Sequence, residues 1–461
     1  MNSQDPPRAP GALPLLGHAL PLLRDPLSFL TALPASGDLV QIRLGPWRAY
    51  VVCSPQLTHQ LLVDDRTFDK GGPLIDRARE ALGAGVATCP HDQHRRQRRL
   101  NQPAFQRARM PAYAALMTEH ITAVTCSWRE GQTVDVLAAL EETAIRILIT
   151  AMFTGSTLSE EDRTGMLHDV MDISRGVFRR MLMPSLLTKL PVLGNRRFEK
   201  AHAHLRDMAK KTIEHHRRSG SDHGDLLSIL MAVHDPDTVG SGASLSDEEL
   251  IDTIITYFFA GAETSASLAA WAVYLTAEHP EVKDQLHAEV DRVLNGAPAT
   301  YADLPHLEVA GRIINETLRL RPPGWIFTRV TTREVQMGRY RCPAGTAVIY
   351  SQYLAHHRPD VFRDPDRFDP DRWRHDRRGS PPPGAFVPFG AGARKCIGDT
   401  FATTEATLAL ATIAAQWSLK PSPGMSIRST PGGLVLRPDG LRMVMAARPR
   451  TRSTTASTSP G

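Results

Sequence analysis

The pattern of apolar and polar residues predicts a chain that is helical over most of its length, with short strands near both ends. Residues 38–53 alternate in the manner of two short strands joined by a tight turn. Helical periodicity dominates from about 92 to 320, with breaks at Gly, Pro and Asp. Residues 326–350 again favour short strands, a helix follows over 399–417, and residues 422–447 favour a final β-hairpin.

These elements indicate a single, mainly α-helical domain with a small β portion, because no internal repeat and no interdomain linker divides them. The domain spans residues 1–447 and opens with a Pro-rich lead-in over 1–37. The Ser- and Thr-rich tail 448–461 lacks the apolar residues of a packed core, so we expect it to be disordered.

One predicted helix is longer and more apolar than the others. It begins with Ser246 and Glu249, which fit a capping box. It ends near Ala277, before the break at His279 and Pro280. At 1.5 Å per residue it is roughly 45 Å long. Apolar residues cover nearly every face of its middle, so we expect it to be buried at the centre of the domain.

The centre of this helix carries residues that a buried helix rarely tolerates. Gly261 costs about 1 kcal/mol relative to Ala, and Glu263 costs more unless it is paired. Thr264 can bond back to the carbonyl of Ala260, and with Glu263 it can hold a water and relay protons. Gly261 can leave room for a ligand, but a close contact with another helix and an outward-facing Glu263 explain the same residues.

Composition argues against several classes of protein. The chain has 461 residues, of which 42% are hydrophobic and 22% charged, as in ordinary globular proteins. Five scattered cysteines without a CxxC pair argue against a disulfide framework and a Cys-rich zinc or iron–sulfur site. The net charge of +5 suits an acidic protein partner at least as well as nucleic acid. Prolines and charges interrupt the apolar N-terminal stretch, so we expect no membrane anchor and a cytoplasmic location.

Cys396 is the thiol with the most unusual neighbours. Gly390, Gly392 and Gly398 flank it and allow tight turns that point backbone N–H groups at the sulfur. Arg394 adds a positive charge two residues before it. A lone Cys is usually a small buried hydrophobe, but this setting also suits a thiolate that binds a metal. Zinc would need three further ligands, and the sequence clusters none here.

Four motifs, in order, resemble those of the cytochrome P450 family. The stretch from Phe389 to Gly398, FGAGARKCIG, is similar to the family's cysteine-loop signature F-G-x-G-x-R-x-C-x-G. ETLR at 316–319 resembles its E-x-x-R helix motif, and FDPDRW at 368–373 resembles its second arginine motif. AGAETS at 260–265 resembles its oxygen-activating helix signature, and the similarity spans roughly residues 10–447.

The resemblance implies a haem b cofactor whose iron is bound by the thiolate of Cys396. It further implies that His94 and Arg98, on one helix face, bind one haem propionate and that Arg329 binds the other. The other residues that it assigns to the cofactor pocket lie in the cysteine loop and on the central helix: Phe389, Gly390, Arg394, Gly398, Ala260 and Gly261.

By the same resemblance the chain is a monooxygenase in which O₂ is the co-substrate and Glu263 and Thr264 deliver protons. Glu263 stands where Asp is common in the family. No flavin or iron–sulfur module fits in the chain, so we expect electrons from NAD(P)H through a ferredoxin reductase and a ferredoxin. Arg95, Arg96 and Arg99 are left for the surface, where they can meet an acidic ferredoxin. We expect no nucleic-acid partner.

Glu316, Arg319 and Arg372 are interpreted as a structural network rather than as catalytic residues. Glu316 and Arg319 share a helix face as i and i+3. Arg372 can complete an Arg–Glu–Arg set that fixes the segment leading to Cys396.

The resemblance places the substrate beside bulky apolar side chains, which favour a compact hydrocarbon. Any of these aromatic residues can equally belong to the core. The chain looks most like actinobacterial family members that oxidise cyclic sesquiterpenes such as pentalenene or epi-isozizaene, so we expect a monomeric sesquiterpene hydroxylase. The alternatives are a macrolide, steroid or fatty acid substrate, a peroxygenase that uses H₂O₂, and a haem sensor or carrier. The positions assigned to the substrate are Tyr257, Trp325, Ile326 and Phe327, with the segments 71–88 and 432–434.

Overall fold

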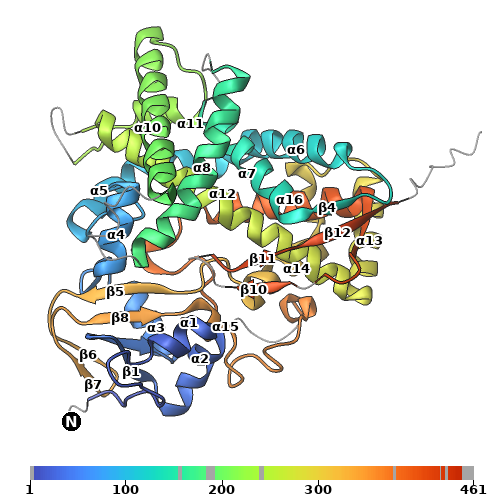
Figure 1. Ribbon diagram of the computed structural model, residues 1–461. Coiled ribbons are helices and arrows are strands. Elements are labelled where there is room, and N and C mark those ends of the chain that lie inside the picture. Colours follow the sequence, from blue (N-terminus) through green and yellow to red (C-terminus); the bar gives the residue numbers. More distant parts are fainter. Residues whose placement is uncertain are drawn as a thin grey trace, which may run out of the picture.

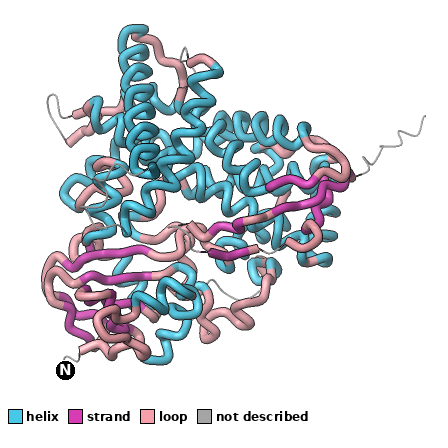
Figure 2. Tube along the Cα trace, in the orientation of Figure 1, coloured by secondary structure: helices cyan, strands magenta, loops and turns pink. Residues whose placement is uncertain are grey.

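The computed structural model describes residues 5–153, 158–182, 193–237, 243–376, 381–425, 427–430 and 435–448. Within these ranges helices make up most of the structure, as predicted, and strands gather in one larger sheet and three smaller ones (Figures 1 and 2). No helix among the described residues is long and apolar enough to cross a membrane. The predicted disordered tail, from 449 on, and the substrate positions 432–434 lie outside the described residues.

Most of the helical residues lie between Pro73 and Leu320, and shorter helices lie on either side of this stretch. In chain order they are α1 (Ala19–Arg24), α2 (Pro26–Ala32), α3 (Pro55–Val63), α4 (Pro73–Leu82), α5 (His91–Asn101), α6 (Met110–Ser127), α7 (Val136–Met152), α8 (Glu160–Leu182), α10 (Leu193–Ser219), α11 (Leu226–Ala232), α12 (Asp247–Glu278), α13 (Pro280–Leu294), α14 (Glu308–Leu320), α15 (Gln352–His356) and α16 (Asp399–Gln416).

α12 crosses the middle of the helical part (Figure 1) and is the longest helix that the structure describes. Its first turn has the predicted capping box: Ser246 Oγ accepts from the N–H of Glu249, whose carboxylate accepts from the N–H of Ser246. Its apolar faces pack on α7, α14 and α16, so it is buried centrally as the sequence predicts. It ends at Glu278, since Pro280 restarts the chain as α13.

The main sheet combines strands from distant parts of the chain. Its strand order is β1 (Leu39–Leu44), β2 (Trp47–Val52), β8 (Ala347–Tyr350), β5 (Phe327–Thr331) and β3 (Phe68–Asp69). β2 and β8 pair in parallel, and the other neighbours are antiparallel. β6 (Val335–Met337) and β7 (Tyr340–Cys342) form a separate antiparallel ribbon. Figure 1 shows β5 on the side of the sheet that faces the helices, and Arg329 is a residue of this strand.

The last strands correct the predicted hairpin over 422–447. β10 (Arg428–Thr430) and β11 (Arg437–Asp439) do form an antiparallel pair in this segment. β12 (Arg442–Ala447), however, lies between β4 (Thr133–Asp135) and β9 (Trp417–Pro421). The sequence pattern could not indicate that arrangement, because β4 is far from β12 along the chain.

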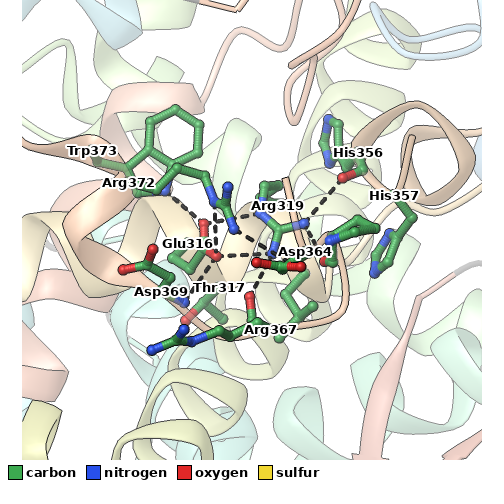
Figure 3. A network of polar contacts seen from close by, with 12 residues as sticks. Glu316, Thr317, Arg319, His356, His357, Asp364, Arg367, Asp369, Arg372 and Trp373 are labelled. Atoms are coloured by element: carbon green, nitrogen blue, oxygen red, sulfur yellow. Dashed lines mark hydrogen bonds and ion pairs between the residues drawn. The ribbon is translucent and has the colours of Figure 1, made fainter. Parts of the chain in front are cut away.

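A buried carboxylate on α14 forms hydrogen bonds with the segment that leads to the cysteine loop (Figure 3). Glu316, which is 0% exposed, accepts from Nε and Nη2 of Arg319 at 2.9 and 2.8 Å. It also accepts from Trp373 Nε1 at 2.8 Å and from the N–H of Asp369 at 3.1 Å. Arg372 Nε completes the set at 3.4 Å. The structure thus joins the three residues that the sequence grouped.

Arg319 anchors the same segment through backbone carbonyls. Its Nη1 donates to the carbonyls of His356 (3.1 Å) and Pro365 (2.6 Å), and its Nη2 to that of Arg367 (3.0 Å). A buried guanidinium that satisfies its donors in this way fixes an irregular stretch of chain without secondary structure. Segment 356–373 is therefore held against α14 before the chain enters the cysteine loop.

Replacing Glu316 tests this network. In Glu316→Gln the buried Arg319 loses its negative partner, so we expect the free energy of unfolding to fall by about 3–5 kcal/mol in urea titrations. The matched control is Asp371→Asn, which breaks the partly exposed pair with Arg312 (2.6 Å) and should cost about 1 kcal/mol or less. Equal losses in the two variants would contradict a bracing role.

Candidate active site

The cysteine loop is shaped by its own backbone and by two glycines. The N–H of Cys396 donates to the carbonyl of Phe389 at 2.9 Å and closes the loop. Gly390 and Gly392 have φ values of 69° and 67°, in the left-handed region that favours glycine. A Cβ on Gly392 would also lie 2.4 Å from the carbonyl oxygen of Leu62, so no other residue fits there.

The surroundings of Cys396 shift the pKa of its thiol. The residue keeps an exposed surface, yet protein surrounds it so closely that burial is the main cause that raises the pKa of its thiol. The N–H of Gly398 donates to the sulfur and opposes this rise. A bound metal cation would favour the thiolate further, so the thiol suits a metal ligand.

Five basic side chains form one electrostatic cluster, and two of its members, Lys70 and Arg98, act on this thiol. They are His94 and Arg98 on α5, Arg329 on β5, Arg394 in the cysteine loop, and Lys70 just before α4. Arg98 reaches the loop itself, because its Nη1 donates to the carbonyl that directly precedes the cysteine, at 2.5 Å. Elements from three parts of the chain therefore bring positive charge to one place.

These cations are poorly compensated. Asp69 is the one carboxylate in the described ranges that forms an ion pair with the set, at 2.8 Å from Arg394 Nη2. Burial, followed by repulsion from Arg329 and Arg394, lowers the pKa of Lys70 to about 7. Burial, followed by repulsion from Arg394 and Lys70, lowers the pKa of His94 to about 3. Nε of Arg394 is buried without a hydrogen-bond partner. An anionic ligand would relieve this excess of positive charge.

Sequence reasoning did not identify Lys70 and Asp69 as site residues. Lys70 Nζ donates to the carbonyl of Ala87 at 2.6 Å and so ties the 71–88 segment to the site. The available signal was a charged pair directly before the Gly71–Gly72 turn, but nothing in it pointed toward Cys396.

The remaining arginines of α5 are engaged within the chain. Arg96 Nη1 lies 2.6 Å from Glu249, and Arg99 Nη2 lies 2.9 Å from Asp235. Both side chains remain partly exposed, at 25% and 30%, so their proposed contact with an acidic ferredoxin stays a prediction. Arg95 is exposed.

The buried middle of α12 contains one short stretch that is exposed. Ala260 is exposed, and Oγ1 of Thr264 donates to its carbonyl at 2.5 Å, as the sequence suggests. Gly261 instead faces α7, since a Cβ there would lie 3.1 Å from Leu148 Cδ1. This contact fits the helix-packing interpretation of Gly261 better than a role in the cofactor pocket.

Glu263 faces a partner that the sequence did not indicate. Its Oε1 accepts from Nη1 of Arg437 on β11 at 2.8 Å. The alternative that Glu263 faces outward into solvent is therefore wrong. The arginine could not be connected to this helix from sequence alone, because it lies in a short strand near the other end of the chain.

Tyr257 and Trp325 belong to the core rather than to a shared pocket. The hydroxyl of Tyr257 donates to Asn101, and its ring makes an edge contact with Phe105 at 5.2 Å between centroids. Trp325 is 5% exposed and packs in the apolar cluster around Leu30. The sequence left open whether these two aromatic residues line a pocket or belong to the core. The structure places both of them in the core.

Phe327 differs from its two predecessors in the chain. Ile326 is partly buried against the same apolar cluster as Trp325. The ring of Phe327 is 37% exposed and stacks on Tyr350, with 5.3 Å between centroids. Phe327 precedes Arg329 by two residues on β5, so both side chains lie on the same face of the strand. Among the four predicted pocket residues, Phe327 is thus the one with a free apolar surface beside the cationic site.

Comparison with known proteins identifies the family. The family model described as cytochrome P450 matches residues 6–445. The chain is 44% identical to a cyclooctat-9-en-7-ol 5-monooxygenase of Streptomyces melanosporofaciens, over 91% of this chain and 90% of that protein. It is 42% identical to a pentalenene oxygenase of Streptomyces avermitilis, over 95% and 97%. The crystal structure of the cytochrome P450DA haem domain matches with a TM-score of 0.87 at 26% identity, over 97% and 99%. The chain therefore belongs to the cytochrome P450 family and is a monooxygenase.

The family implies haem and O₂, and the residues of the site fit haem. The thiol of Cys396 keeps an exposed surface and accepts a hydrogen bond from the N–H of Gly398, so it suits an iron ligand. The excess of buried positive charge calls for an anionic group, and haem carries two propionates. The orphaned Nε of Arg394 is one donor that such a group can satisfy.

The depressed pKa of His94 yields a pH prediction for the haem-free protein. The unfolded chain binds a proton at His94 below about pH 6.5, whereas the folded chain does so only near 3. Stability is therefore complete above pH 6.5 and falls, by up to about 1.4 kcal/mol per pH unit, as the pH drops toward 3. The variant His94→Gln has no group that titrates at this position. The stability advantage of wild type over this variant should therefore shrink as the pH falls from 6.5 toward 3. A difference independent of pH would contradict the shift.

Proposed function

We propose that this monooxygenase hydroxylates a cyclic terpene, in the first place a sesquiterpene hydrocarbon. The similarity to two terpene-oxygenating P450s, at 44% and 42% identity over almost the whole chain, supports this proposal most directly. The exposed ring of Phe327 beside the cationic site supplies an apolar contact for such a substrate. Further oxidation of the alcohol can follow, because the product can stay in the same pocket.

In this proposal Cys396 binds the haem iron through its thiolate, and the loop formed by Phe389, Gly390 and Gly398 aims backbone donors at the sulfur. When bound, haem supplies the activation of O₂ and its insertion into a C–H bond.

The basic residues take the propionates. His94 and Arg98 bind one carboxylate and Arg329 the other, with Arg394 and Lys70 adding charge behind them. Neutral His94 can act as a hydrogen-bond donor even while its pKa is depressed. The propionates in turn stabilise the five side chains that the fold brings together.

Glu263 and Thr264 carry protons toward the oxygen that is being activated. The hydroxyl of Thr264 can donate a proton to that oxygen, and Glu263 then supplies a new proton to Thr264. Electrons come from NAD(P)H through a ferredoxin reductase and a ferredoxin, because the proposal gives the chain no redox group besides haem. The chain is proposed to act as a cytoplasmic monomer.

The substrate class is tested by a titration of the purified holoenzyme with cyclic terpenes, followed by mass spectrometry of turnover products. The panel contains pentalenene, epi-isozizaene and a larger cyclic terpene alcohol, with a steroid and a fatty acid as comparison compounds. We expect a low- to high-spin shift and a hydroxylated product with at least one terpene. Turnover of the steroid or fatty acid alone would contradict the terpene assignment.

Replacing Cys396 tests the iron ligand. In Cys396→Ser the reduced, CO-bound protein should lose the red-shifted Soret band that thiolate ligation produces, and product formation should stop. Cys126→Ser, which changes an exposed thiol, is the control and should leave the band unchanged. A retained band in Cys396→Ser would remove this residue as the ligand.

Replacing Thr264 tests the proton relay. Thr264→Ala removes the hydroxyl, so product formed per NAD(P)H should fall about tenfold or more while hydrogen peroxide release rises. Thr264→Ser keeps the hydroxyl and should recover most of the coupling. Unchanged coupling in Thr264→Ala would exclude the hydroxyl from the relay, and peroxide-driven activity without any NAD(P)H-driven activity would favour a peroxygenase.

A further inference from the structure

The exposed apolar side chains of this protein are concentrated near its N-terminus. Among the described residues, seven large hydrophobic side chains are exposed, and five of them come from residues 13–23 and from position 47. Single exposed apolar residues are normal on a protein surface, but a contiguous set of them marks an interaction site. We call these five residues the leucine patch: Leu13, Leu15, Leu16, Leu23 and Trp47.

Hydrogen bonds place most of the leucine patch on two neighbouring turns. The N–H of Leu13 donates to the carbonyl of Gly17 at 2.8 Å, and the N–H of Gly17 donates back to the carbonyl of Leu13 at 2.9 Å, which closes a tight turn. The N–H of Gly45, in the turn between β1 and β2, donates to the carbonyl of Leu16 at 3.1 Å. Trp47 begins β2 directly after this second turn. Four members of the patch therefore lie side by side on the two turns, and the fifth lies on α1, which follows the first turn.

Leu15, at the tip of the first turn, has a conformation that stability does not explain. Its φ is 61°, in the left-handed region where the Cβ of a leucine is crowded and where glycine and asparagine are favoured. Its side chain is 88% exposed, so it adds little to the core. A bulky residue that is both strained and exposed is a candidate for a function. The turn thus presents Leu15 outward at a cost to the fold.

The backbone of this turn suits entry into an apolar layer. Polar backbone groups are costly in the hydrocarbon region of a membrane unless they are paired within the protein. The carbonyl of Leu13 accepts from the N–H of Gly17 and from Nη2 of Arg43 (3.1 Å). The carbonyl of Pro14 accepts from the N–H of Leu16 at 2.7 Å, and Pro14 has no N–H of its own to satisfy. These groups can therefore leave water without losing a hydrogen-bond partner.

Arginines flank the leucine patch, and the segments that carry the patch contain no acid. Residues 11–24 and 42–52 include neither Asp nor Glu. The exposed arginines of these segments are Arg24, Arg43 and Arg48. Within the described ranges none of them forms an ion pair. The acid that comes next in the chain, Asp25, caps α2 by accepting from the N–H of Ser28 at 3.2 Å. The patch therefore combines apolar side chains with positive charge that its own segments do not compensate.

We propose that the leucine patch docks this protein on an anionic lipid surface. In this arrangement Leu15 and Leu16 enter the apolar layer, Trp47 lies at the level of the headgroups, and the arginines bind lipid phosphates. Side chains of two turns and of α1 make the contact, and the rest of the fold stays outside the bilayer, so the contact is peripheral and reversible. It involves no residue of the proposed active site and stands independently of the proposed function.

A lipid surface fits the patch better than a protein partner does. A stable protein interface buries about 800 Å² on each partner and involves about 20–30 residues on each side. The leucine patch has five apolar side chains, and its most exposed member projects from the tip of a turn. Insertion of a few apolar side chains beside basic residues is a common way for peripheral proteins to bind membranes. A terpene hydrocarbon also partitions into lipid, so the contact brings the enzyme to a substrate of the proposed class.

Flotation of the purified holoenzyme with lipid vesicles tests the proposal. We expect binding to vesicles of phosphatidylcholine and phosphatidylglycerol in equal parts, and binding that is about tenfold weaker to pure phosphatidylcholine. High salt should weaken binding to the anionic vesicles, because it screens the charges of the arginines. A holoenzyme that does not bind the anionic vesicles at low salt would overturn the proposal.

Replacing the two leucines at the tip separates lipid contact from folding. In the double variant Leu15→Asn, Leu16→Ser the affinity for anionic vesicles should fall about tenfold or more, because two apolar side chains no longer enter the layer. In Leu15→Asn alone the midpoint of thermal unfolding should stay the same or rise, since asparagine is favoured at a left-handed φ. The matched control is Val63→Ser on α3, which removes another exposed apolar side chain (44% exposed) and should leave vesicle binding unchanged. Full binding by the double variant, or an equal loss in the control, would overturn the proposal.

A second pair of variants tests the charges. Arg24→Gln, Arg48→Gln should lower the affinity for anionic vesicles about tenfold and leave the weak binding to pure phosphatidylcholine unchanged. Arg43 is kept, because its side chain donates to the first turn. The control Lys210→Gln, Lys211→Gln removes the same charge from exposed positions of α10, which Figure 1 shows at the opposite end of the molecule from α1 and β1. Equal losses in the two pairs would show that binding follows net charge alone and would contradict docking through the patch.

Tryptophan fluorescence reports which face meets the lipid. The chain has six tryptophans, and we expect lipids with brominated acyl chains to quench mainly Trp47 when the holoenzyme binds their vesicles. Trp47→Phe should still bind the vesicles and lose most of the quenching. Equal quenching in wild type and Trp47→Phe would place another face on the lipid and overturn the proposal.

Sedimentation of the holoenzyme without lipid tests a second copy of the chain as the occupant of the patch. The proposal predicts the same oligomeric state for wild type and for the double variant Leu15→Asn, Leu16→Ser. A wild-type dimer that becomes a monomer in this variant would make the patch an interface between copies and would overturn lipid docking.

Discussion

The burial of several like charges around a single thiol constrains the rest of this structure. Positive side chains that are removed from water without matching anions destabilise a fold by several kcal/mol each. Here Arg329, Arg394 and Lys70 are brought together beside neutral His94, with one carboxylate, Asp69, in contact. An anionic ligand stabilises such an arrangement, and a haem with two propionates and a thiolate-binding iron satisfies both the charge and the sulfur.

This site depends on elements that have no direct sequence connection. α5 and β5 present their cations from the helical part and from the main sheet, respectively. The cysteine loop must reach them after a long irregular segment, and the buried pair of Glu316 and Arg319 fixes that segment by binding its carbonyls and side chains. Stability of the α14 network is therefore a condition for the geometry of the site, although the network touches no part of the reaction.

The two sides of α12 face different environments, and each side presents polar residues to its own environment. One side exposes Ala260 and Thr264, and the other directs Glu263 toward Arg437. A helix in which apolar residues cover the remaining faces can place two polar side chains with little freedom, which relay chemistry requires. The contact of Gly261 with Leu148 brings α7 close to this point.

The sequence predicted features that local physics determines. The capping box of α12 and its end before Pro280 rest on neighbouring residues, as do the glycines of the cysteine loop. What the sequence missed depends on contacts between distant segments. Arg437 reaches Glu263 from another strand, Lys70 approaches Cys396 only in the folded chain, and β12 pairs with β4 rather than closing a simple hairpin. Tyr257 and Trp325 have side chains equally suited to a pocket and a core, and packing alone decides between them.

X-ray absorption at the iron edge of the purified holoprotein tests the central claim most directly, because it reports the atoms bound to the metal. The account requires one sulfur ligand at the iron in addition to the four porphyrin nitrogens. An iron bound by nitrogen or oxygen ligands alone, in protein that still turns over substrate, would contradict it.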